Sequence, residues 1–254
     1  MKITDKITIT NEDNMELMAR YPDGYFDIAI VDPPYFSGPE KRKYYGNAVN
    51  KLNIKRVDYS PLENSWELPT AEYFSELFRV SKQQIIWGCN YYAEFIPNVG
   101  RIVWDKVNSE SSFSDAEIAS SSFHNSVRLF RFMWNGMMQG CDFEGNMQGD
   151  KKLNEKRIHP TQKPVALYKW LLDKYVKPGD KVLSTHLGSG SDAIAFYDMV
   201  NFWDLTDNNS ILESEFIGCE LDKEYYNSAI NRIKHHIAFN QSLFQPEELI
   251  QTLF

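Results

Sequence analysis

Four residues that follow an apolar run have the chemical groups needed to hold a base with an amino group. The run Phe26 to Val31 is typical of a strand buried on both faces, and it stops at Asp32-Pro33-Pro34-Tyr35 because two prolines cannot continue a central strand. Ligands of a doubly wound sheet bind at the carboxyl ends of its strands. Asp32 and the Pro33 carbonyl would offer two acceptors to a planar base with an exocyclic amine, and Tyr35 a stacking face. The tetrapeptide alone equally suits a tight turn.

A second set of residues suits a nucleoside cofactor. A strand-like run over residues 181–184 leads to Gly188-Ser189-Gly190, a helical pattern follows, and the next strand-like run ends in Glu220. Glycines let the backbone approach a ligand at a helix N-terminus, and an acid after the following strand can accept bonds from two ribose hydroxyls. The full dinucleotide fingerprint and the Walker pattern are absent, and such loops are often plain turns. This unit alone therefore leaves cofactor binding open.

With the hexapeptide His159-Pro160-Thr161-Gln162-Lys163-Pro164, these segments resemble the β-class amino-methyltransferases of DNA, which use S-adenosylmethionine. Residues 32–35 match their DPPY motif, 159–164 their HPTQKP segment and 187–191 their glycine-rich loop, in the order of that class. The resemblance covers residues 7–235. It implies a circularly permuted, Rossmann-like α/β fold of the class I methyltransferase type, with a doubly wound, mostly parallel sheet. It also implies methyl transfer to N6 of adenine in DNA by base flipping and direct attack, without a metal.

The resemblance also assigns roles to single residues. The catalytic residues would be Asp32, Pro33, Pro34 and Tyr35, with Tyr35 stacked on the target base. Glu220 would hold the cofactor ribose and Asp13 the cofactor adenine, although Asp13 would also suit a helix N-cap. The residues expected to bind S-adenosylmethionine are Asp13, Asp32, Thr161, Lys163, Ser184, His186, Gly188, Ser189, Gly190 and Glu220.

The chain departs from the family pattern beside the glycine-rich loop. The family usually has an acid where this chain has Ser184, and a Pro-Phe pair where it has Thr185-His186. The group expected near the cofactor's ammonium is therefore replaced. His186 could be a general base, but a loop histidine is more often structural.

Basic residues are concentrated in two segments between the matched motifs. Residues 36–59 and 108–156 are the candidate DNA-recognition elements, although charged runs of this kind are more often solvated loops. The chain as a whole is acidic, with a formal net charge of −8, which argues against indiscriminate coating of nucleic acid. The predicted DNA contacts are Lys41, Arg42, Lys43, Tyr44, Lys51 and Arg56.

Length and composition predict a single α/β domain over residues 1–254. No apolar run approaches the ~20 residues of a membrane span. The first residues show no signal region, and three scattered cysteines suggest neither disulfides nor zinc. We therefore expect a cytoplasmic protein without a metal.

Hydrophobic patterns predict strands that alternate with helices, which favours a parallel sheet. The stretch from Ser109 to Ser122 is expected to be a polar loop with one short amphipathic segment. Strands are predicted at 7–10, 26–31, 84–88, 102–105, 127–132, 181–184 and 216–220, and helices at 15–18, 70–79, 164–175, 192–200 and 223–236.

Three alternatives stay open. The same acceptors would serve the N4 amine of cytosine, although Asp at the first motif position leans towards adenine. Ser184 would suit a homologue that binds DNA or cofactor but has lost catalysis. A methyltransferase acting on protein or RNA is a third choice. The segment 246–250 suits packing on the core or on a second copy, so a homodimer also stays open, as does pairing with a restriction nuclease.

Overall fold

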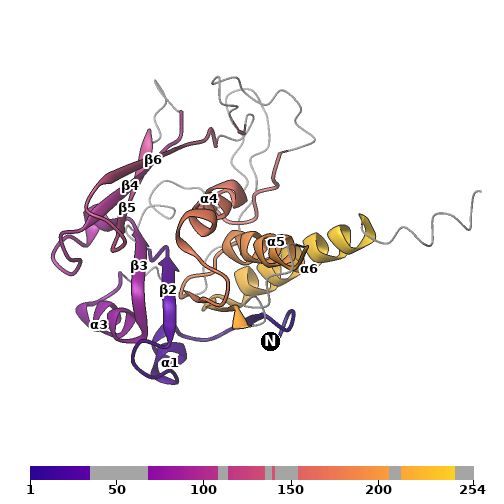
Figure 1. Cartoon of the computed structure of the whole chain (residues 1–254), viewed down its shortest axis with the longest axis horizontal. Helices are drawn as coiled ribbons and strands as arrows, with labels where there is room; N and C mark the ends of the chain where they lie inside the picture. Colours follow the sequence, from indigo (N-terminus) through magenta and orange to yellow (C-terminus); the bar gives the residue numbers. More distant parts are fainter. Residues whose placement is uncertain (35–67, 108–113, 135–138, 141–153, 206–212, 244–254) are drawn as a thin grey trace, which may run out of the picture.

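The computed structural model describes residues 1–34, 68–107, 114–134, 139–140, 154–205 and 213–243 (Figure 1). In these ranges no helix combines the length and the apolar character that crossing a bilayer requires. The strands are β1 (Ile7–Thr10), β2 (Phe26–Val31), β3 (Ser81–Trp87), β4 (Gly100–Asp105), β5 (Ala116–Ser121), β6 (Val127–Arg131), β7 (Lys181–Ser184) and β8 (Glu215–Cys219). The helices are α1 (Asn14–Ala19), α3 (Ala71–Val80), the short 3-10 helix η1 (Cys89–Tyr91), α4 (Val165–Tyr175), α5 (Ser191–Leu205) and α6 (Lys223–Leu243).

The strands form one sheet in the order β1-β8-β7-β2-β3-β5-β4-β6. Neighbours from β1 to β3 are all parallel, whereas β5 runs antiparallel to both β3 and β4. The predicted α/β fold with a mostly parallel sheet is therefore confirmed. Because β5 is reversed, its first residues lie at the edge where the parallel strands end.

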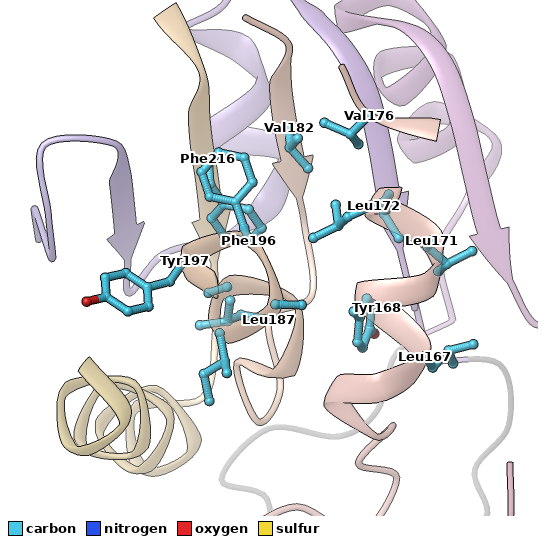
Figure 2. Close-up of a cluster of buried hydrophobic side chains, with 14 of the residues drawn as sticks. Leu167, Tyr168, Leu171, Leu172, Val176, Val182, Leu187, Phe196, Tyr197 and Phe216 are labelled. Carbon is cyan, nitrogen blue, oxygen red and sulfur yellow. The ribbon is translucent and has the colours of Figure 1, made fainter. Parts of the chain in front are cut away.

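Helices cover both faces of the sheet, as the apolar run of β2 predicts. Alternate side chains of a strand point to opposite faces. Ile28 and Ile30 belong to the core beneath α4, α5 and α6, and Ala29 and Val31 to the core beneath α1 and α3, which Figure 1 shows apart from the other helices. Figure 2 shows the first core, where α4 and α5 meet β7 and β8 through Leu167, Tyr168, Leu171, Leu172, Val182, Phe196 and Phe216.

The loop predicted from Ser109 to Ser122 is wrong where β5 lies. Ala116–Ser121 pair with β4 along their whole length and with β3 at their end. Ala119, Ser120 and Ser121 are buried between those neighbours. Serine and alanine have little intrinsic preference for strands, so tertiary pairing rather than local sequence creates β5.

Candidate active site

A cavity of about 590 Å³ lies at the carboxyl ends of β1, β2, β7 and β8. Its volume is typical of small-molecule and cofactor sites. Predicted site residues that line it are Asp13, Asp32, Pro33, Pro34, Thr161, Lys163, His186, Gly188, Ser189 and Glu220. Ser184 and Gly190 are not among its lining residues. Predicted residues that lie outside the described ranges are Tyr35, Lys41, Arg42, Lys43, Tyr44, Lys51 and Arg56.

Asp32 has two carboxylate oxygens in different environments. Oδ2 is ion-paired with Lys163 Nζ. Oδ1 is buried and accepts no hydrogen bond from the described residues. Burial raises the pKa of the Asp32 carboxyl, and the Lys163 ammonium acts against this rise. One oxygen is therefore held by a cation, and the other remains available as an acceptor.

Lys163 is also paired with an acid that the sequence does not point to. Its Nζ lies 3.0 Å from Glu117 Oε2, and the second oxygen of Glu117 binds Lys106. Burial disfavours the Lys163 ammonium, but Asp32 and Glu117 outweigh burial and raise its pKa. Burial likewise disfavours the Glu117 carboxylate, but its two lysine partners prevail and lower its pKa to about 2. Lys163, predicted to complete the cofactor pocket, lies between two carboxylates.

The backbone of the Pro-Pro pair is held from η1. The Tyr92 hydroxyl, just after η1, donates to the Pro34 carbonyl at 2.5 Å and to the Pro33 carbonyl at 3.3 Å. A carbonyl oxygen has two lone pairs, so the Pro33 oxygen retains capacity for a further donor. Tyr92 is buried. It is a second contact that the local sequence does not predict.

Glu220, directly after β8, is joined to the glycine-rich loop. Its Oε2 accepts from the Gly188 backbone at 2.8 Å, and its Oε1 from the Asp222 backbone at 3.0 Å. Burial raises the pKa of Glu220 to about 7 despite these donors. Each oxygen retains a lone pair for a ligand hydroxyl.

The glycine-rich loop is shaped by backbone conformation and by α6. Gly188 and Gly190 have φ of 54° and 71°, the left-handed region that favours glycine. A Cβ on Gly190 would lie 2.8 Å from Ile233 Cδ1. Arg232 donates to the Ser189 carbonyl at 2.8 Å and to Ser191 Oγ at 2.9 Å. Helix α6 therefore packs against the loop too closely for a side chain at Gly190, and it also donates hydrogen bonds to the loop.

The 159–164 segment folds over the glycine-rich loop. The His159 ring faces Gly188, about 4 Å from the position a Cβ would take, and its Nδ1 lies 3.1 Å from Thr161 Oγ1. The Gln162 side chain accepts from the Ile158 backbone, and the Gln162 carbonyl accepts from Trp134. Burial lowers the pKa of His159 to about 3, so its ring is neutral at neutral pH.

Polar side chains form a chain of contacts along the cavity wall. His186 Nε2 lies 3.1 Å from Asn14 Nδ2, and His186 Nδ1 lies 2.9 Å from Thr185 Oγ1, which is 2.7 Å from the Tyr73 hydroxyl. An amide nitrogen only donates, so Nε2 accepts and the ring is neutral. Burial also lowers the pKa of His186 to about 3. Because the Nε2 lone pair is already bonded and a group of such low pKa is a weak base, His186 suits a structural role better than that of a general base.

Asp13 and Ser184 have clear local partners. Asp13 is the N-cap of α1, and its Oδ1 accepts from the Met15 backbone at 2.7 Å, while the residue also lines the cavity. Asp13 is therefore both a cap and a cavity residue. Ser184 is buried, and its hydroxyl donates to Asp192.

Comparisons with known proteins identify the family of the chain. The family model described as DNA methylase (N6/N4 methyltransferases) matches residues 57–231. The type II methyltransferase M2.MboI of Moraxella bovis is 22% identical over 87% of this chain and 88% of its own. The structure of M1.HpyAVI with S-adenosylmethionine is 20% identical over 89% of this chain and 99% of its own, with a TM-score of 0.49.

The fold itself is shared with a solved cytosine-N4 methyltransferase. The PvuII DNA methyltransferase, which is specific for cytosine N4, has a TM-score of 0.51 at 13% identity, over 92% of this chain and 93% of its own. Because the family model spans more than half of the chain, the protein belongs to the DNA methylase family of N6 and N4 amino-methyltransferases.

Proposed function

We propose that the chain transfers a methyl group from S-adenosylmethionine to the N6 amine of adenine in DNA. The observation that carries this proposal is the state of Asp32. Its Oδ2 is ion-paired, and its Oδ1 is buried without a hydrogen bond from the described residues, on the wall of a cofactor-sized cavity. A buried acceptor gains stability from a donor, and an amine supplies two donors.

The cavity fits the cofactor. Glu220 would accept bonds from ribose hydroxyls while it remains held by Gly188 and Asp222. The N-terminus of α5 follows the glycine-rich loop and favours an anion such as the methionine carboxylate. Asp13 lies on the cavity wall, where it would accept a hydrogen bond from the amine of the cofactor's adenine. When bound, S-adenosylmethionine supplies an electrophilic methyl group on a charged sulfonium.

The protein's part in the reaction is to hold and polarise the amine. Asp32 Oδ1 and the Pro33 carbonyl would each accept one hydrogen bond from the amine. Both bonds favour a tetrahedral nitrogen with a localised lone pair. The nitrogen–methyl bond then forms as the sulfur–methyl bond breaks, and one amine proton leaves through Asp32. Positioning and electrostatics would supply most of the rate.

A base inside a duplex cannot reach this cavity, so the mechanism requires base flipping. Tyr35 remains the proposed stacking partner of the flipped base. Lys41, Arg42, Lys43, Lys51 and Arg56 remain the proposed phosphate contacts, with Tyr44 beside them. Within the other proposed recognition element, residues 108–156, the described part forms β5 and β6.

The decisive test is product analysis. Unmethylated DNA is incubated with S-adenosylmethionine and the protein, digested to nucleosides and analysed by mass spectrometry. We expect N6-methyladenine from the wild type and none from Asp32→Ala. The fold shared with a cytosine-N4-specific enzyme makes N4-methylcytosine the rival product. That product alone would overturn the choice of adenine, and cofactor or DNA binding without any product would favour a non-catalytic homologue.

A further inference from the structure

We propose that Glu117 is a positioning residue that holds Lys163 on one oxygen of Asp32. The inference rests on the proposed function, because it explains how the Asp32 carboxylate stays open to an amine. Glu117 is not among the residues that line the cavity. Its Oε2 lies 3.0 Å from Lys163 Nζ, and Lys163 is also ion-paired with Asp32 Oδ2. Glu117 would therefore act through Lys163 rather than on base or cofactor.

The reversed strand brings Glu117 to Asp32. Glu117 is the second residue of β5, which is antiparallel to β3, so it lies at the edge where β2 ends in Asp32. It pairs with Trp104 of β4, and cross-strand partners share a face. Trp104 is fully buried in the core, so Glu117 also faces inward. A parallel strand at this place would start at the opposite edge.

The position of the Lys163 ammonium is tightly defined. Its side chain is 1% exposed, so carboxylates rather than water must balance its charge. Its Nζ lies 5.3 Å from the centre of the Trp87 ring, which favours a cation there. Glu117 is held in turn by Lys106. Lys163 is therefore bound from the Glu117 side by a group that is itself fixed.

Removing the Glu117 charge would release this restraint. Lysine ends in a compact ammonium on a flexible stem, with three donors that can rotate. Without one of its two carboxylates, Lys163 could move across both oxygens of Asp32 and occupy Oδ1. The amine would then lose its acceptor. Keeping Lys163 on Oδ2 is the role that we assign to Glu117.

The test compares Glu117→Gln with the wild type in three measurements. These are single-turnover methyl transfer to duplex DNA, equilibrium binding of S-adenosylmethionine, and carbon-13 NMR titration of the Asp32 carboxyl, assigned with Asp32→Asn. We expect the transfer rate to fall at least tenfold and the cofactor Kd to change less than threefold. We expect Asp32 to titrate at lower pH, because the negative charge of Glu117 is lost while Lys163 and Lys106 remain.

Three further variants separate positioning from stability. Glu117→Asp keeps the charge and should recover part of the rate, and it replaces Glu117→Gln if that variant does not fold. In a Lys163→Met background, Glu117→Gln should cost less than threefold, because its route to Asp32 is gone. Glu76→Gln removes an ion-paired carboxylate from α3 and should leave the rate unchanged.

The inference is overturned by an unchanged rate and titration in Glu117→Gln, or by the same loss in both backgrounds. Failure of the proposed function looks different, because the wild type itself would then transfer no methyl group. In that case crystal structures of the wild type and Glu117→Gln decide the role of Glu117, because the inference expects Lys163 Nζ to move onto Asp32 Oδ1 only in the variant, and this readout needs neither cofactor nor DNA.

Discussion

The Ser184 hydroxyl, at the end of β7, donates a 2.5 Å hydrogen bond to Asp192 Oδ2 in the first turn of α5. Both side chains are buried. Burial raises the pKa of Asp192 to about 6, which the Ser184 bond partly opposes. A carboxylate is therefore present beside position 184, although a helix supplies it rather than the strand.

This pairing predicts the effect of exchanging the two residues. Ser184→Asp places two buried carboxylates in contact and should lower the free energy of unfolding by ~2–4 kcal/mol at pH 8. The double variant Ser184→Asp/Asp192→Ser should recover most of that loss. Denaturant unfolding at pH 8 and pH 5 measures both effects. The single variant should be less impaired at pH 5, where the pair can share a proton. A double variant as unstable as the single one would contradict the expectation.

The raised pKa of Glu220 predicts that the free energy of unfolding decreases with pH while the affinity for S-adenosylmethionine increases with pH. Its pKa is raised from 4.5 to about 7, so between these values the folded protein retains a proton that the unfolded chain has lost. Stability should therefore fall as pH rises through this window. Glu220→Gln lacks this fall and should be ~1–2 kcal/mol more stable than the wild type at pH 8.

Cofactor affinity should change in the other direction. The wild type should bind S-adenosylmethionine more tightly at pH 8 than at pH 6, because the carboxylate is the better acceptor for hydroxyls. Glu220→Gln should bind about tenfold more weakly at pH 8, a loss of ~1.4 kcal/mol, and show little pH dependence. Calorimetric titration at both pH values tests this. The exposed Glu224→Gln serves as the control and should match the wild type in both stability and binding.

Tyr92→Phe should slow methyl transfer more than it lowers stability. The hydroxyl's bonds to the Pro33 and Pro34 carbonyls are lost, at a cost of ~1 kcal/mol in unfolding free energy. A small displacement of the Pro33 carbonyl should reduce the rate about tenfold. Tyr25→Phe removes a 3.0 Å hydroxyl bond to Glu215 at the opposite edge of the sheet. It should cost similar stability and leave the rate unchanged.

Gly190→Ala should be destabilising for two separable reasons. Alanine is strained at φ of 71°, and its Cβ would lie 2.8 Å from Ile233 Cδ1, for a combined cost of ~2–3 kcal/mol. Gly24→Ala has φ of 63° with the nearest atom at 3.8 Å, so it measures the strain alone. Ile233→Val removes the clashing methyl and should reduce the cost of Gly190→Ala. Equal costs in thermal unfolding for the two glycine variants would argue against the packing contribution.

The predicted DNA contacts can be tested through salt dependence. Changing Lys41, Arg42 and Lys43 together to Ala should weaken DNA binding and reduce the slope of log K against log salt by about 2–3. A charge-matched control replaces the exposed Lys2, Lys223 and Lys234 with Ala. If both triple variants lose affinity equally, the 41–43 segment is not a specific contact.

Local sequence was sufficient for the elements that carry the motifs. The apolar run of β2 is bounded by its own residues, Phe26 to Val31, and Pro33 stops it, so both its limits and the place of Asp32 could be predicted. The bounds of β7 likewise agree with the prediction. These features depend on backbone chemistry within a few residues.

The partners of those motif residues could not be predicted in this way. Glu117 reaches Lys163 only because β5 pairs with β3 and β4, and no apolar alternation marks β5. Tyr92 reaches Pro33 across 59 residues of sequence. Asp192 is close to Ser184 in sequence, but the hydrogen bond depends on how α5 begins. Each contact depends on tertiary pairing, which a single sequence does not record.

Among the described residues, Lys106, Glu117, Lys163 and Asp32 form one ion-paired cluster of two cations and two anions around the buried Lys163. The charges of such a group sum to zero. At distances larger than the group itself, its electric field therefore falls off faster than that of a lone ion. Asp32 can therefore remain ionised inside an acidic protein of net charge −8 without adding long-range repulsion against an approaching polyanion. A DNA phosphate would therefore be repelled by the Asp32 carboxylate only at short range.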